Sequence, residues 1–144
     1  MTTTLTHKFI LSISGLTAVG IGAAILIVPM AFHSTNGIAL GDDSSLLSEI
    51  RAPGGALLTM GVFMLAGLLR ERLVRFSLGV GAAVFLSYGL SRCLAIALDG
   101  WPASGLVAAA AFELLIGALC VFGLVGNSRA ARHAGQPLDH QAHG

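Results

Sequence analysis

The most informative residues in this sequence are charged side chains inside long apolar stretches. Arg92 is the only Asp, Glu, Lys or Arg within residues 76–98, and Glu113 is the only one within residues 103–125. Tyr88 lies one helical turn before Arg92, and Glu49 lies near the start of the apolar stretch over residues 46–69. A guanidinium stays charged and donates in a fork that suits an anionic or carbonyl oxygen. A desolvated carboxyl can transfer a proton. These residue types favour a polar binding site, with Glu113 and Tyr88 as candidates for an acid or base.

The composition places these charges in a membrane protein. Of 144 residues, 55% are hydrophobic and 10% are charged, against about 25% charged in soluble domains, so a soluble enzyme is excluded. About 20 apolar residues are needed for a helix to cross the hydrocarbon core, and four stretches reach that length: residues 9–28, 46–69, 76–98 and 103–125. Their apolar runs are continuous rather than alternating, which indicates helices. We therefore predict an all-α, four-helix transmembrane bundle over residues 1–125, with the lipid bilayer as its surroundings.

The segments that flank these stretches differ in charge. Basic residues lie before the first stretch, between the second and third, and after the fourth, which are the ends on one side of the bundle: Lys8, Arg70, Arg72, Arg75, Arg129 and Arg132. The opposite connections carry acidic residues: Asp42, Asp43 and Asp99. The positive-inside rule then predicts that both termini are cytoplasmic. Residues 126–144 show no apolar period, and we expect them to form a disordered cytoplasmic tail.

The cysteines and histidines argue against several cofactors. Cys93 and Cys120 stand in different predicted helices, at depths that differ by more than a disulfide tolerates, and no C-x-x-C is present. Every histidine lies outside the four predicted helices, which removes the axial ligands that a membrane haem needs. We predict no cofactor and no metal site. The net charge of +1 and the lack of a basic cluster also predict no nucleic-acid partner.

Small residues recur every four positions in three of the predicted helices, which indicates faces for close helix packing. The three faces are Ser14, Ala18 and Gly22; Gly79, Ala83, Ser87 and Ser91; and Gly105, Ala109, Glu113 and Gly117. Because Glu113 belongs to such a face, we expect it to point into the bundle. The helical rise puts Tyr88, Arg92 and Glu113 in the same half of the bundle, toward Asp99. Association of two copies through the glycine faces remains an open alternative.

One string of residues resembles a known family. Residues 48–55 read S-E-I-R-A-P-G-G, residues 88–92 read Y-G-L-S-R, and Leu98-Asp99-Gly100 forms the turn before the helix with Glu113. With these features the chain resembles an uncharacterised bacterial family of small four-helix inner-membrane proteins that is catalogued as a domain of unknown function. The resemblance covers about residues 8–125. It implies the topology and a place in the bacterial inner membrane, and it implies no activity.

Two functions from different classes fit these residues, and a third is open. In the first, Arg92 and Glu113 form an ion pair that fixes helix register in a structural or assembly protein. In the second, a pocket opens outward between the second, third and fourth helices and binds a lipid-soluble or amphipathic anionic small molecule. The residues expected to line it are Glu49, Arg51, Tyr88, Arg92, Asp99 and Glu113. The third alternative is a proton or small-solute relay. Whether any reaction is catalysed is left open.

Overall fold

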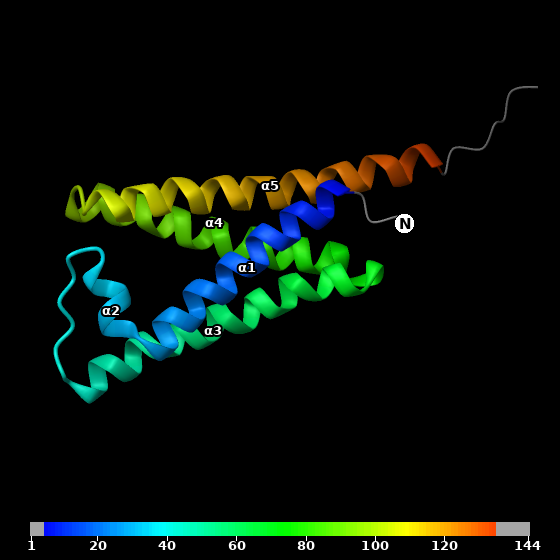
Figure 1. The fold of residues 1–144 in the computed structure, drawn as a ribbon. Helices are drawn as coiled ribbons and strands as arrows, with labels where there is room; N and C mark the ends of the chain where they lie inside the picture. Colours follow the sequence, from blue (N-terminus) through cyan, green and yellow to red (C-terminus); the bar gives the residue numbers. More distant parts are fainter. Residues whose placement is uncertain (1–4, 135–144) are drawn as a thin grey trace, which may run out of the picture.

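The computed structural model describes residues 5–134, and its side chains are described through Gly126. The elements in chain order are α1 (Leu5–Ile27), α2 (Pro29–Ser34), α3 (Ser44–Leu69), a 3-10 turn (Glu71–Leu73), α4 (Val74–Asp99) and α5 (Ser104–Ala134), as drawn in Figure 1. Within the described residues, four helices are long and apolar enough to cross a membrane, and no strand occurs. The predicted all-α, four-helix class is therefore confirmed.

The helix ends differ from the predicted ones in ways that local chemistry explains. After α1 the chain does not enter a loop at once, because Pro29 begins the six-residue helix α2. A proline is well suited to a first helical turn, where its missing N–H leaves no hydrogen bond unmade. Helix α3 begins after Asp43, whose carboxylate accepts a hydrogen bond from the Leu46 N–H at 2.7 Å.

The last helix runs beyond the predicted end at residue 125. Helix α5 continues to Ala134, so the segment that we expected to be disordered is helical over residues 126–134. This part of the sequence contains alanines and arginines, which favour helices, and its first proline comes later, at Pro137. The expectation for residues 135–144 lies outside the described residues.

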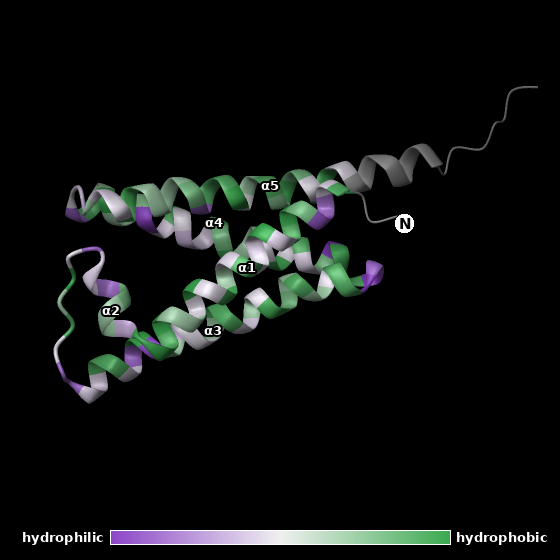
Figure 2. Cartoon of the chain, viewed as in Figure 1, coloured by the Kyte–Doolittle hydropathy of each residue, from purple (hydrophilic) through white to green (hydrophobic). Residues whose placement is uncertain are grey.

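The long helices form two close pairs, α1 with α3 and α4 with α5. The pairs lie close together toward the end that holds the α3–α4 turn, and they separate toward the end that holds α2 and the loop over residues 35–43 (Figure 1). Figure 2 shows apolar residues along the long helices and hydrophilic residues gathered mainly near their ends. The termini of the described chain lie at the end where the pairs meet.

Glycines allow close contact within each pair. A Cβ added at Gly22 of α1 would lie 2.7 Å from the carbonyl oxygen of Gly54, and one added at Gly61 of α3 would lie 2.7 Å from the Val19 nitrogen. In the second pair, an added Cβ at Gly117 of α5 would lie 2.7 Å from the Leu86 side chain. Such positions let membrane helices approach until backbone touches backbone or side chain.

Of the three small-residue faces predicted from the sequence, two are buried at least in part and one is not. The first, Ser14, Ala18 and Gly22 of α1, is buried as expected. The third, in α5, is buried at Glu113 and Gly117. The second is wrong as a face packed within this chain, because Ala83, Ser87 and Ser91 are exposed. The buried face of α4 lies two positions away and contains Ser77, Gly81, Phe85 and Gly89, which also recur every four residues.

The contact at Gly22 predicts a strong response to a single methyl group. Gly22→Ala should lower the free energy of unfolding by roughly 1–3 kcal/mol, because the new Cβ would press on the backbone of α3. Gly20→Ala is the matched control, since nothing lies within 4 Å of its added Cβ. Thermal unfolding of both variants in detergent measures the difference. Equal stability of the two variants would contradict the packing described for α1 and α3.

Candidate functional site

A cavity of about 420 Å³ lies between the two helix pairs. Its walls come from all five helices and from the loop after α2. Most of its lining side chains are apolar, including Ile21 and Ile25 of α1, Leu57 of α3, Phe85 of α4 and Leu106 of α5. A space of this kind suits a molecule that is largely hydrocarbon.

The polar lining of the cavity includes an ion pair between α4 and α5. Arg92 Nε donates to Glu113 Oε2 at 2.9 Å and to Oε1 at 3.2 Å. The Glu113 side chain is 11% exposed and that of Arg92 is 33% exposed, and both line the cavity. The pairing expected from helix depth is therefore present. Among the described residues, the terminal Nη groups of Arg92 have no hydrogen-bond partner.

Two more of the predicted site residues reach the cavity. Tyr88, one helical turn before Arg92 on α4, is half-buried and packs against the core. Glu49 of α3 also belongs to the lining, although its side chain is largely exposed, so it stands at the rim. The structure thus brings together Glu49, Tyr88, Arg92 and Glu113 from three helices.

The remaining two predicted site residues are elsewhere. Arg51 is exposed, and its Nε donates to the Leu26 carbonyl oxygen at 3.1 Å. Leu26 lies in the last turn of α1, where carbonyl groups lack helical partners, so Arg51 satisfies one of them. Asp99 is the exposed last residue of α4. Neither residue belongs to the cavity lining.

The sequence reasoning missed a side of the cavity that α2 and the following loop provide. Phe32, His33 and Asn36 all line it. The Nε2 atom of His33 is buried and has no hydrogen-bond partner among the described residues, while its ring meets Phe32 edge to face at 5.5 Å. Asn36 touches α5, since a Cβ added at Gly105 would collide with its Oδ1. The available signal was Pro29, which favours a helix start.

The charged groups around the cavity are two carboxylates, Glu49 and Glu113, and one guanidinium, Arg92. Within the part of the chain that the structure describes, no three His, Cys, Asp or Glu side chains are grouped to hold a metal ion. The arrangement offers hydrogen-bond donors from Arg92 and Tyr88 on α4, a few polar groups from α2, its loop and α3, and apolar side chains over most of the remaining wall. It can therefore bind a polar group and a hydrocarbon part of the same molecule.

Comparisons with known proteins give the family of the chain and no activity. Residues 6–124 match the family model of the domain of unknown function DUF4345. That range contains almost all of the sequence from α1 to the part of α5 beside the cavity. No curated protein and no solved structure matches the chain.

Exchange of the two charges tests whether the ion pair stabilises the fold. Arg92→Glu and Glu113→Arg should each lower the free energy of unfolding by roughly 2 kcal/mol, less than the ~3–5 kcal/mol of a fully buried pair because Arg92 is one-third exposed. The double variant should recover most of the loss, as thermal unfolding can measure. Additive losses in the double variant would show that the pair contributes no interaction of its own.

Proposed function

We propose that this chain, which belongs to the family of the domain of unknown function DUF4345, binds a lipid-soluble or amphipathic small molecule in the cavity between its two helix pairs. The single observation that carries the proposal is the cavity of about 420 Å³ with the Arg92–Glu113 pair in an otherwise mainly apolar wall. Ligand cavities are typically about 300–1,000 Å³, mostly apolar, with a small number of polar groups that fix orientation.

In this proposal each polar residue has a distinct role. The free Nη groups of Arg92 receive an anionic or carbonyl oxygen of the ligand. Glu113 holds the guanidinium in place through its 2.9 Å contact with Nε. Tyr88, one turn away on the same helix, contributes a hydroxyl group. No reaction is proposed, since the lining offers no nucleophile with an adjacent base.

The alternative of a purely structural ion pair draws support from the burial of Glu113. A carboxylate in that position needs a cation nearby, and Arg92 provides it. The ion pair also leaves the Nη donors of Arg92, whose side chain is 33% exposed, available to an oxygen of a ligand. The binding proposal therefore adds a role to the pair and keeps its structural one.

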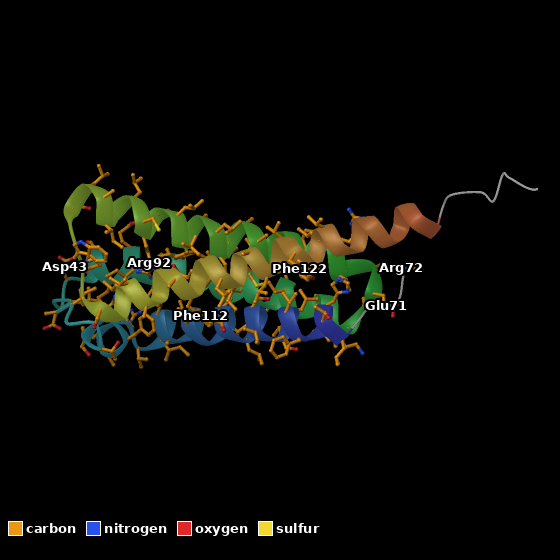
Figure 3. The ribbon with its side chains drawn as sticks, turned by 90° about the horizontal axis from the view of Figure 1, so that it is seen from above. Asp43, Glu71, Arg72, Arg92, Phe112 and Phe122 are labelled. Carbon is orange, nitrogen blue, oxygen red and sulfur yellow. The ribbon has the colours of Figure 1, made fainter. Side chains whose placement is uncertain are left out.

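The proposal includes a location in the bacterial inner membrane, with both termini in the cytoplasm and the cavity in the outer half. Figure 3 supports the sidedness in relative terms: Asp43 and Arg92 lie toward one end of the molecule, and Glu71 and Arg72 lie at the other. Lys8, Arg70 and Arg75 belong to that second end by their places near the start of α1, directly after α3 and near the start of α4. An end rich in lysine and arginine is favoured on the cytoplasmic side.

Filling the cavity should remove its occupant. We expect the wild-type protein to co-purify with a small molecule. Ala109 lines the cavity, so Ala109→Phe should prevent that molecule from binding. Ala111→Phe is the matched control, because Ala111 lies on the same helix and is exposed. Mass spectrometry of gently extracted samples, normalised to protein, compares the three. The same small molecules in equal amounts in all three samples would refute the proposed binding.

The orientation can be tested with reporters fused to the chain. A fluorescent protein fused after residue 144 should fluoresce, since it folds in the cytoplasm, and alkaline phosphatase at that position should be inactive. Phosphatase inserted in the exposed loop between Gly37 and Asp42 should be active, since it requires export. The reverse pattern of activities would overturn the proposed sidedness while leaving the cavity unaffected.

A further inference from the structure

We infer that the polar group of the ligand is an uncharged oxygen acceptor, such as a ketone or ester carbonyl, and that it is received by the Nη donors of Arg92. The inference rests on the proposed function and specifies the chemical class of its ligand. It narrows the choice between an anionic and a carbonyl oxygen that the residue types alone left open.

The charges around the cavity disfavour an anion. Glu113 already compensates the Arg92 guanidinium, with Nε and Oε2 2.9 Å apart. Glu49 adds a second carboxylate at the rim. An anionic ligand at the Nη groups of Arg92 would place a second negative charge beside Glu113, where one guanidinium already compensates one carboxylate, and repulsion between like charges is strong where water is scarce. Glu49 adds less repulsion, because water screens its exposed side chain.

A cationic ligand fits no better. The carboxylate of Glu113, which would attract it most strongly because it is buried, is occupied by Arg92. Glu49 is largely exposed, so its attraction for a cation is weakened by water. A cation inside the cavity would also lie beside the guanidinium.

A neutral acceptor agrees with both the charges and the donors. The terminal nitrogens of Arg92 have no partner among the described residues, and a guanidinium can donate from each of them. A carbonyl oxygen accepts such hydrogen bonds and leaves the Arg92–Glu113 pair intact. The ligand thereby gains a charge-assisted hydrogen bond without bringing a net charge into the cavity.

The apolar walls indicate the character of the rest of the molecule. Ile21, Ile25 and Phe85 give the cavity apolar surfaces for a hydrocarbon part. Its volume of about 420 Å³ lies within the range of small-molecule sites, and it is partly open, so a ligand can extend beyond it. A carbonyl compound with a single hydrocarbon chain suits these walls, and a 12-carbon chain serves as the probe.

The test compares three probes that share a 12-carbon chain: 2-dodecanone, dodecanoate and dodecylammonium. Each is added to protein in nanodiscs of zwitterionic phosphatidylcholine, and the shift in melting temperature is measured. The proteins are the wild type, Ala111→Phe, Ala109→Phe, and the double variant Arg92→Met with Glu113→Leu. The double variant removes both charges together and so avoids an unpaired buried carboxylate.

We expect 2-dodecanone to raise the melting temperature of the wild type and of Ala111→Phe by several degrees more than that of the other two proteins. The two charged probes should shift all four proteins alike. A larger, cavity-dependent shift with dodecanoate or dodecylammonium would overturn this inference and leave the proposed function standing. An equal shift of the double variant by 2-dodecanone would remove Arg92 from the role assigned to it.

Absence of any cavity-dependent shift would also overturn the inference. The co-purification experiment then decides the fate of the proposed function separately. An occupant that is lost in Ala109→Phe and retained in Ala111→Phe would keep the cavity as a binding site for a ligand of another class. No such occupant would refute both.

Discussion

The arrangement of this protein depends on the compensation of one charge, the Arg92 guanidinium, within an apolar helix. A charged side chain in a membrane-spanning helix costs up to about 2.5–3.5 kcal/mol on insertion scales, the value at the bilayer centre, so it requires a partner or access to water. Glu113 of the neighbouring helix provides the partner at 2.9 Å. Two glycine contacts follow this pair toward the end that holds the α3–α4 turn: Gly89 meets Leu114, and Gly117 meets Leu86. The two helices are therefore close enough at this level for the short charged contact to form.

The two ends of the helix bundle are packed differently. Near the α3–α4 turn, the inner face of α4 carries the buried residues Ser77, Leu78 and Gly81, and toward the other end Phe85, Tyr88 and Arg92 line the cavity. At the packed end, Gly81 allows the buried Cys120 of α5 to approach closely.

Helix α1 follows the same trend. Ser14 and Ala18 are fully buried, while Ile21 and Ile25 further along line the cavity. The oxygen of Ser14 is satisfied within its own helix by the Ile10 carbonyl at 2.8 Å, so a small polar residue is tolerated in the packed end. The helix pairs diverge toward the end that holds α2, and the space between them opens beside Arg92.

The length of each helix and the depth of a residue along it could be predicted from apolar runs and helical rise. The direction in which a side chain points around the helix axis, and the presence of a short helix, could not. The four spans and the placement of Arg92 and Glu113 in the same half of the bundle follow from counting residues along helices. The direction of Arg51 does not, because it depends on the nearby end of α1. In α4 two small-residue faces compete, and only the contacts with α5 select the one that contains Gly89.

The part of the site on α2 was out of reach for a different reason. Six residues are too few for a helical period to stand out, so the sequence predicts no helix over residues 29–34. The helix nevertheless brings Phe32 and His33 to the cavity.

The structural and the binding roles of the Arg92–Glu113 ion pair are compatible, since the contact that fixes Arg92 during folding also orients its remaining donors. A ligand that meets a guanidinium already held by Glu113 loses less conformational freedom on binding than one that must order a mobile side chain.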